Sequence, residues 1–448
     1  MACRVTELSA SRWQWQLANR VQTAAELSRY VRLTEKEKTD IEAAGARFRW
    51  AVTPYFASLM DPEDPDCPLR RQVIPSAAEL SPAQAGLGDP LAEDSHSPVH
   101  GLIHKYPDRV IIMVTMQCAM FCRHCTRRRQ VGQVDRAMTA KQLAACVDYL
   151  RQHEEIRDVL VTGGDPLVGG DAWLEHILRE LRAIPHVEVL RIGTRAPVTM
   201  PQRITRELCE MLERYHPLWM NIHFNHPKEI TPEVAEACDR LSRAGIPLGS
   251  QTVLLRGVND DLETLKKLYH GLTRIRVRPY YLYQCDTVQG TSHFWTPVER
   301  GLELIQNLRG FTSGFCVPTF VVDSPLGKVQ VAPRNFLARE GDEIVLRGYT
   351  GATCRMHNPA SVEGIADGRL GAIEAQTALA EVAAGHGNWD ADRQPPARSR
   401  GGLDSGWPPG LLSKGPGAFG PVRVDATGDS CFHPQGGGPG AQDSKDGS

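Results

Sequence analysis

The sequence lacks the features that mark a membrane, secreted or nucleic-acid-binding protein. No apolar run approaches the roughly 18 residues that a membrane-spanning helix needs, and the N-terminal stretch MACRVTELSASRWQWQ contains no apolar segment of the secretory-signal kind. The formal net charge is only -2, whereas a protein that binds nucleic acid by bulk electrostatics usually needs a basic excess. We therefore expect a cytoplasmic protein with a small-molecule ligand and with neither a membrane nor a nucleic-acid partner.

Clustered cysteines are also scarce. Only three of the 12 cysteines stand close together, as Cys118, Cys122 and Cys125 in MQCAMFCRHCTRRR. Others, such as Cys146 and Cys209, stand singly in segments with helical apolar spacing and are most simply small buried side chains. Scattered thiols of this kind fit a reducing, cytoplasmic compartment.

From about residue 109, short β-rich runs alternate with amphipathic helical runs. We expect strands at 109–115, 158–164, 189–195, 218–224, 247–255, 277–283 and 318–323. Between them we expect helices at 139–154, 171–184, 205–216, 231–245, 261–275 and 298–308. This alternation predicts βαβ units and a parallel sheet.

Polar residues follow several expected strands, in GGDPL, GTRAP, FNHPKE and YQCD, and in a β/α barrel the functional face lies at the carboxyl ends of the strands. A doubly wound sheet would have a glycine-rich loop after its first strand, where this sequence has the cysteines. We therefore predict an α/β protein with a partial (β/α)6-type TIM barrel. The expected parts are a helical N-terminal region and connector at 1–95, the barrel at 96–335, a C-terminal extension at 336–384 and a disordered Gly/Pro-rich tail at 385–448.

Three interpretations of the cysteine cluster compete. A zinc site would need a fourth ligand and usually combines separated cysteine pairs, while His124 is wedged between two of the three thiols. A redox pair would use Cys122 and Cys125 and leave Cys118 surplus. An iron–sulfur cluster with only three protein thiolates keeps one iron open, and the amino and carboxylate groups of S-adenosylmethionine (SAM) can chelate that iron. The spacing Cys-x3-Cys-x2-Cys after the first strand resembles the signature of the radical SAM superfamily and favours a [4Fe-4S] cluster.

Beyond the cluster, residues 13–350 resemble the lysine 2,3-aminomutase family. The matching stretches include WQWQLANR, TPYFASLMDPEDPDCPLRRQVIPS, CRHCTRRR, VTGGDPL, RIGTRAPV, HFNHPKEIT, PLGSQTVLLRGVND, RPYYLYQCD and VPTFVVDSP. The resemblance implies a barrel of the radical SAM type that holds a [4Fe-4S] cluster, SAM and pyridoxal 5′-phosphate (PLP). It also implies an isomerase that moves the α-amino group of a basic amino acid, first of all L-lysine, to the β-carbon. An electron donor such as flavodoxin or ferredoxin would reduce the cluster.

The resemblance also implies where PLP would be held. In the family, the lysine that forms a Schiff base with PLP follows the last barrel strand, where this sequence has Lys328 in VVDSPLGKVQV. The family usually has a longer glycine run there, and a solvated loop lysine is the alternative. We expect partial burial to lower the pKa of Lys328 so that it can lose its proton. Arg109 and Lys105 match phosphate-holding positions and Tyr106 would line the PLP ring; for Arg109 the alternative is a surface ion pair with Asp108.

Three further residues match the substrate contacts of the family. Arg127, two residues after Cys125, would bind the α-carboxylate bidentately. Asp286 and Asp323 would grip a side-chain ammonium, because two converging carboxylates repel each other unless a cation neutralises them. Two aspartates argue against an acidic substrate, although arginine, ornithine or a protein-bound lysine would also supply the cation. Barrel salt bridges are the alternative for the aspartates, and a non-catalytic iron–sulfur protein is the alternative for the whole chain.

The SAM pocket would be completed by residues at the carboxyl ends of the strands and beside the cysteines. Glycines there would let the backbone approach the methionyl amine closely. The candidates are Gly163, Gly164, Asp165, His124, His223, Asn225 and Gln251.

One feature of the family is missing. Well-known lysine 2,3-aminomutases bind zinc at a subunit contact with one cysteine after GVND and a Cys-x-Cys-x2-Cys group near the C-terminus. This sequence has Asp261 after GVND, Cys354 alone and Cys431 in the tail. We therefore predict no zinc, which puts the tetramer of the family in doubt but leaves a homo-oligomer such as a dimer open.

Overall fold

All residues that the computed structural model describes belong to the unit Met1–Trp389. They are residues 12–81, 86–133, 135–331, 336–347 and 352–359. The predicted disordered tail lies outside the described residues. No helix among the described residues is long and apolar enough to cross a membrane.

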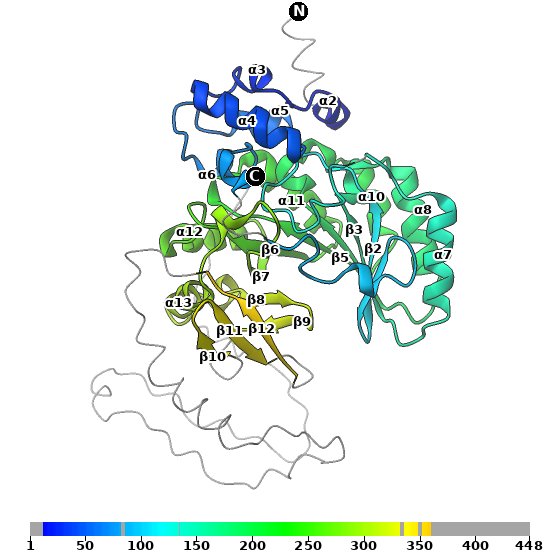
Figure 1. Ribbon diagram of the computed structural model, residues 1–448. Coiled ribbons are helices and arrows are strands. Elements are labelled where there is room, and N and C mark those ends of the chain that lie inside the picture. The colour runs from blue at the N-terminus through cyan, green and yellow to red at the C-terminus, as the bar shows by residue number, and fades with distance from the viewer. Residues whose placement is uncertain (1–11, 82–85, 134, 332–335, 348–351, 360–448) are drawn as a thin grey trace, which may run out of the picture. The chain divides into compact units, whose positions relative to one another are not determined.

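A nine-stranded sheet forms the centre of this unit (Figure 1). Its strands follow chain order: β1 (Leu102–Tyr106), β2 (Arg109–Thr115), β3 (Asp158–Gly163), β4 (Val189–Thr194), β5 (Leu218–His223), β6 (Leu248–Leu254), β7 (Val277–Gln284), β8 (Thr319–Ser324) and β9 (Gly327–Gln330). The strands from β2 to β8 run parallel, and β1 and β9 pair antiparallel at the two edges. Since β1 and β9 do not pair with each other in the described sheet, it forms a partial barrel. The predicted fold class is confirmed.

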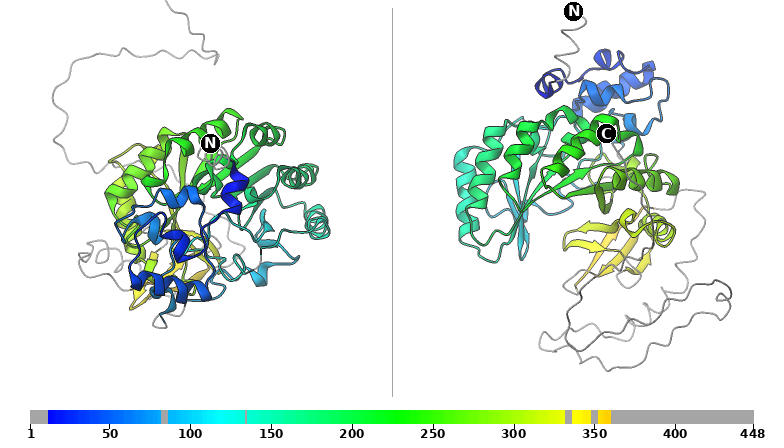
Figure 2. Two further views of the ribbon diagram at one scale, coloured as in Figure 1. Left: turned by 90° about the horizontal axis from the view of Figure 1, so that it is seen from above. Right: turned by 180° about the vertical axis from the view of Figure 1, so that it is seen from behind.

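Long helices connect the consecutive parallel strands and lie along the outer side of the sheet (Figure 2). They are α7 (Ala140–Arg151), α8 (Asp171–Arg182), α10 (Arg206–Glu213), α11 (Pro232–Arg243), α12 (Leu262–Arg274) and α13 (Val298–Leu308). Thr139, Thr205, Thr231 and Asp261 each cap one of these helices, because the side-chain oxygen accepts from a free backbone N–H of the first turn. Asp261 is thus the N-cap of α12.

The packed side of the sheet follows from its register. Ile112, Val161, Ile192 and Met220 are paired in a row across β2 to β5, and none has exposed surface. Parallel strands of this kind are buried under crossover helices, which explains their apolar runs. Each Å² of apolar surface removed from water contributes about 25 cal/mol, so this core holds the strand ends in place.

Short helices occupy the loops at the carboxyl ends of the strands, the approach to β1 and the connection from α13 to β8. They are η2 (Asp94–His96), η3 (Pro166–Val168), α9 (Ala196–Thr199), η4 (Pro201–Arg203), η5 (Pro227–Glu229), η6 (Ser292–Phe294) and η7 (Gly314–Cys316).

The N-terminal region is helical, as predicted, and covers the carboxyl ends of the strands (Figure 1). The hydroxyl of Thr53 donates to the carbonyl of Thr199, and the hydroxyls of Tyr55 and Thr231 bond to each other. These contacts join the region to the loops after β4 and β5. Its helices are α2 (Trp13–Ala18), α3 (Ala24–Leu27), α4 (Glu35–Arg47), α5 (Pro54–Ser58), α6 (Pro68–Arg71) and η1 (Ala77–Leu80).

A separate antiparallel sheet follows β9. It consists of β10 (Phe336–Glu340), β11 (Glu343–Arg347) and β12 (Thr353–His357). Ile344 and Leu346 are its most buried side chains and join the main core.

Candidate active site

The carboxyl ends of the strands surround a cavity of about 380 Å³. This volume lies within the range of small-molecule sites. Asn225 alone among the predicted site residues does not line it. Those that do are Lys105, Tyr106, Arg109, Cys118, Cys122, His124, Cys125, Arg127, Gly163, Gly164, Asp165, His223, Gln251, Asp286, Asp323 and Lys328.

The three clustered cysteines lie in the loop after β2, and all three thiols are free. Burial raises the pKa of Cys118 well above its usual value and the pKa of Cys125 to about 11, so neither charges easily without a cation. No three His, Cys, Asp or Glu side chains converge on a single-ion site among the described residues. A cluster of several irons does not require such convergence. We call residues 118–129 the cysteine wall.

Arg195, which the sequence did not single out, stands directly behind a cluster cysteine. Its Nη1 donates to Cys122 Sγ at 2.8 Å, and its Nη2 donates to Gln72 Oε1 at 2.6 Å and to Glu229 Oε1 at 3.0 Å. All of these partners except Cys122 are buried. The stretch GTRAP at the end of β4 was the only signal for this arginine.

A second buried carboxylate anchors the wall from the N-terminal region. Glu79 accepts from Arg123 through both oxygens, at 2.9 and 2.6 Å, and from Arg128 at 2.6 Å. The side chains of Glu79 and Arg123 are each 1% exposed. Two of the arginines beside the cysteines are therefore structural, because each is paired where no ligand can reach it.

Two histidines and Asn225 form the layer between the cysteine wall and β5. His223 Nε2 donates to Asn225 Oδ1 at 3.0 Å, while Asn225 Nδ2 lies 3.2 Å from His124 Nε2. Burial lowers the pKa of His124 well below its usual value and the pKa of His223 to about 3, because it disfavours the charged form of both rings. The predicted contact of Asn225 with SAM is corrected, because a side chain without exposed surface orients the histidines instead.

Gly163 and Gly164 lie where the turn after β3 contacts the loop after β2 too closely for a side chain. A Cβ on Gly163, whose φ is +133°, would lie 2.3 Å from the Thr115 carbonyl oxygen, and a Cβ on Gly164 would lie 2.1 Å from that of Gln117. Gly164 N–H also donates to the Thr115 carbonyl at 2.6 Å. The glycines therefore let the turn after β3 pack on the start of the cysteine loop.

The carboxylate of Asp165 is fully used within the protein. It accepts from the Thr194 hydroxyl at 2.6 Å, from Arg195 N–H at 2.8 Å and from Leu167 N–H at 3.0 Å. These bonds join the ends of β3 and β4. Its backbone is paired as well, since Asp165 N–H donates to the Gln117 carbonyl at 2.7 Å and its carbonyl accepts from Val168 N–H at 3.2 Å.

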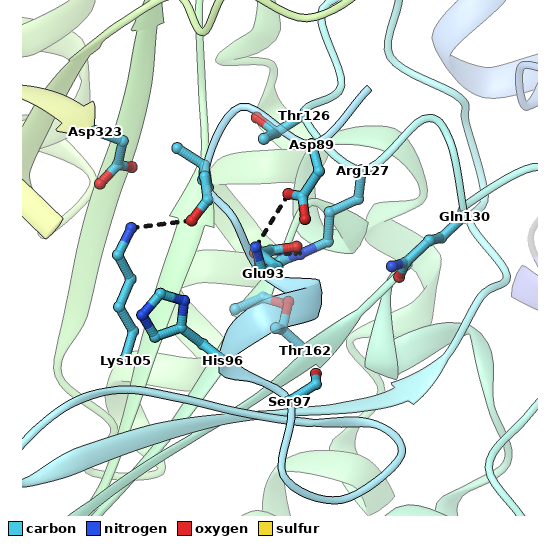
Figure 3. Close-up of polar contacts among 12 residues, drawn as sticks. Asp89, Glu93, His96, Ser97, Lys105, Thr126, Arg127, Gln130, Thr162 and Asp323 are labelled. Carbon is cyan, nitrogen blue, oxygen red and sulfur yellow. Dashed lines mark hydrogen bonds and ion pairs between the residues drawn. The ribbon is translucent and has the colours of Figure 1, made fainter. Parts of the chain in front are cut away.

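Arg127 reaches the cavity and forms an ion pair that the sequence did not predict (Figure 3). Its Nε and Nη2 donate to the carboxylate of Glu93, with a shortest distance of 2.7 Å. Glu93 comes from the irregular segment before β1, and nothing in the sequence pattern marked it.

Asp286 and Asp323 lie on the opposite side of the cavity, at the ends of β7 and β8. Burial raises the pKa of Asp286 well above its usual value, and the charge of Asp323 raises it further. The Thr126 hydroxyl donates to Asp286 Oδ2 and fixes its orientation. The two carboxylates are therefore close enough for the charge of Asp323 to act on Asp286.

Lys328 stands directly opposite Asp323, because β8 and β9 form a tight hairpin in which these two residues pair. Gly327, with φ +110°, makes the turn possible. Lys328 Nζ donates to the carboxylate of Asp323 at 2.8 and 3.0 Å. The short loop therefore still brings the lysine to the cavity. We call Asp286, Asp323 and Lys328 the lysine wall.

The expected lowering of the Lys328 pKa is wrong for the cofactor-free chain. Burial lowers this pKa, but the neighbouring Tyr283 and Asp323 outweigh burial and leave it raised. An ammonium paired with a carboxylate is stabilised in its charged form.

Lys105 and Arg109 differ in what they offer an anion. Lys105 Nζ donates to the carbonyls of Ser324 at 2.6 Å and Leu91 at 3.0 Å, which leaves the third N–H of its ammonium for the predicted phosphate contact. The Arg109 guanidinium lies 4.1 Å from the centre of the Tyr106 ring, and no described carboxylate pairs with it. The alternative of an ion pair with Asp108 is not observed.

Comparison with known proteins agrees with this geometry. The sequence profile of the radical SAM superfamily matches residues 112–268, and that described as lysine-2,3-aminomutase matches residues 305–390. The chain is 51% identical to the L-lysine 2,3-aminomutase of Clostridium subterminale over 79% of this chain and 86% of the relative. It is 50% identical to the L-lysine 2,3-aminomutase of Bacillus subtilis (strain 168) over 78% of this chain and 74% of the relative, and 47% identical to the glutamate 2,3-aminomutase of Clostridioides difficile (strain 630) over 80% and 85%. The chain therefore belongs to the lysine 2,3-aminomutase family of the radical SAM superfamily.

Proposed function

We propose that this protein is an isomerase that moves the α-amino group of L-lysine to the β-carbon, using a [4Fe-4S] cluster, SAM and PLP. The observation that carries the proposal is that one cavity is lined by the three free thiols together with Arg127, Lys328, Asp286 and Asp323. An electron carrier needs the thiols but has no use for the other groups. The family membership supports the same three cofactors.

The residues present fit the cofactors. The three thiols supply the ligands of a cluster with one open iron, and His124 Nδ1, which has no hydrogen-bond partner among the described residues, fits a contact with SAM. Lys328 would hold PLP through Nζ, and the unpaired guanidinium of Arg109 fits its phosphate. When bound, the cluster and SAM supply the radical that removes a hydrogen atom, and PLP stabilises the radical during nitrogen migration.

The chain itself positions the amino acid between the two walls. Arg127 would bind the α-carboxylate beside the cysteines, and Asp286 with Asp323 would bind the side-chain ammonium. Thr126 holds Asp286 in place. Holding both ends of a flexible substrate places its α- and β-carbons at a fixed distance from the radical source, and such positioning is a large part of catalysis.

The two aspartates also favour lysine over the rival substrates. An acidic amino acid would add a third carboxylate to this end of the cavity, which costs free energy without a cation. A protein-bound lysine has no free α-carboxylate for Arg127. Arginine and ornithine satisfy both ends and are the alternatives that only measurement separates.

For its partners and location we propose an electron donor of the flavodoxin or ferredoxin type, a homo-oligomer, and the cytoplasm. The cluster needs one electron from outside the chain. The cysteines among the described residues form no disulfide, which supports a reducing compartment.

The proposal is tested by anaerobic reconstitution with iron, sulfide and PLP, followed by incubation with labelled lysine, SAM and a reductant. We expect labelled β-lysine, with SAM regenerated rather than consumed. β-Arginine from arginine without β-lysine from lysine would change the substrate. Neither product, together with no absorbance band from PLP bound to lysine, would refute the aminomutase.

A matched variant separates the two cofactors. The Lys328→Gln variant should keep its full content of iron and sulfide but lose PLP on dialysis. The reason is that Lys328 Nζ bonds to Asp323 and not to the cysteine wall. Loss of iron together with PLP would contradict the assigned role of Lys328.

A further inference from the structure

A short acidic segment lies against the cysteine wall at the cavity mouth. We call residues 89–97 the strap. The Asp89 carboxylate accepts from the backbone N–H groups of Glu93 at 3.1 Å and Asp94 at 3.0 Å, which closes the strap into a turn. Arg129 of the cysteine wall pairs with Asp89 at 3.1 Å and with Asp94 at 2.8 Å. The strap is therefore anchored by ion pairs that do not involve the cavity.

One strap residue, Glu93, points toward Arg127, the side chain proposed to bind the substrate carboxylate (Figure 3). Glu93 accepts from Arg127 Nε at 3.0 and 3.1 Å and from Arg127 Nη2 at 2.7 Å. The Glu93 side chain is 7% exposed and that of Arg127 is 20% exposed. No described residue accepts from Arg127 Nη1, although Arg127 lines the cavity.

The effect of the Glu93–Arg127 ion pair on substrate binding depends on which edge of the guanidinium Glu93 contacts. A guanidinium is a rigid planar fork, with one side edge formed by Nε and Nη2 and one end edge formed by Nη1 and Nη2. Glu93 occupies the side edge. The end edge is left for a second carboxylate, so Glu93 and a substrate carboxylate bind Arg127 together and do not compete for the same hydrogens.

We propose that Glu93 is a positioning residue for the substrate carboxylate: it holds Arg127 by its side edge so that the end edge faces the cavity in a single orientation. This inference rests on the proposed function and adds a residue to it. A free arginine side chain must give up much rotational freedom when it binds a ligand, and an arginine held in advance does not. Recognition of an α-carboxylate therefore depends on the strap as well as on the cysteine wall.

The test compares lysine with cadaverine, the same diamine chain without the carboxylate. Their binding to anaerobic protein loaded with cluster and PLP is measured by equilibrium dialysis without SAM, so that no turnover occurs. Glu93→Ala should weaken lysine binding about 10-fold to 100-fold, as expected for loss of a charge-assisted contact, and should leave cadaverine binding unchanged. Glu93→Gln keeps an acceptor and should fall between Glu93→Ala and the wild type.

The matched control is Asp94→Ala in the same strap. Its carboxylate pairs with Arg129 and is 68% exposed, so its loss should leave the ratio of lysine to cadaverine affinity unchanged. In turnover, Glu93→Ala should raise KM for lysine with kcat within about threefold, because uniform binding is lost rather than transition-state binding.

Each other outcome overturns the inference in a distinguishable way. Equal losses for lysine and cadaverine would mean that Glu93 only supports the strap, and tighter lysine binding would mean that Glu93 competes with the substrate. If the wild type prefers lysine to cadaverine and Glu93→Ala keeps that preference, the role of Glu93 is refuted but that of Arg127 is not. If the wild type binds both probes equally, the proposed roles of Arg127 and Glu93 are both refuted.

Discussion

The cysteine wall and the lysine wall both carry many charges, but they satisfy them differently. In the cysteine wall, Arg123 and Arg128 are paired with the buried Glu79, and neither lines the cavity. In the lysine wall, Asp286, Asp323 and Lys328 all line the cavity, Lys328 pairs with Asp323, and the charge of Asp323 acts on Asp286.

The difference separates support from function. Ion pairs outside the cavity hold a segment in place and are not affected by a ligand. Charged side chains that line the cavity exchange their partners when a ligand binds. In the cofactor-free chain, Lys328 Nζ is hydrogen-bonded to the Asp323 carboxylate. Its ammonium therefore lies where we expect the side-chain ammonium of the substrate lysine. Three changes test this contrast.

Removing the charge from Glu79 should produce the largest effect. Glu79→Gln leaves two buried arginines without their carboxylate, and breaking a buried pair in this way costs about 3–5 kcal/mol. We expect a loss of that size in the free energy of unfolding, measured by chemical denaturation of the cluster-free protein. The control is Glu35→Gln, whose partner Lys38 is on the surface and whose loss should cost less than about 0.5 kcal/mol. A loss at Glu79 as small as that of the control would contradict the supporting role of the cysteine wall.

Replacing Arg195 should change the cluster as well as the stability of the fold, because Arg195 also pairs with the buried Glu229. Arg195 donates to Cys122 Sγ at 2.8 Å, and a hydrogen bond and positive charge at a cluster sulfur favour the reduced, more negative cluster. Arg195→Gln should therefore lower the reduction potential, followed by redox titration with electron paramagnetic resonance, and lower activity about 10-fold to 100-fold.

The buried Arg203, which donates to the Leu167 carbonyl and to Asp171, is the matched control. Arg203→Gln should leave the potential unchanged. Equal shifts in both variants would mean that the potential responds to general disturbance and not to the Cys122 contact.

Sequence reasoning located the barrel because its strands are buried apolar runs between capped, amphipathic helices, a pattern that is local in the chain. It located the cavity residues because they match family motifs at strand ends. It did not indicate β10 and β12, whose apolar residues are interrupted by charged ones such as Arg339 and Arg355. Local apolar spacing gives little signal for strands of that kind.

The supports of the site could not be predicted, because their partners lie far apart in the chain. Glu79 and Arg123 are 44 residues apart, and Glu93 and Arg127 are 34 apart. A buried glutamate in an irregular segment has no local pattern that distinguishes it from a solvated one. The same limit explains why the direction of the Lys328 pKa shift was predicted wrongly. That shift depends on the register of the β8–β9 hairpin, which pairs Lys328 with Asp323.

The pH dependence of substrate binding should give the smallest effect and test the lysine wall alone. Burial, and then the charge of Asp323, raise the pKa of Asp286, so this carboxyl takes up a proton at a higher pH than a free aspartic acid, whose pKa is about 3.9. Only ionised Asp286 attracts the substrate ammonium. Lysine affinity should therefore be full above the raised pKa and should fall by up to about tenfold per pH unit below it. Asp286→Asn should bind lysine more weakly and with a flat profile. The control ligand is norleucine, which has the carboxylate of lysine but no side-chain ammonium, and its affinity should not change over the same range. A parallel decline for norleucine would place the titrating group at the carboxylate end of the cavity and remove the contrast between the two walls.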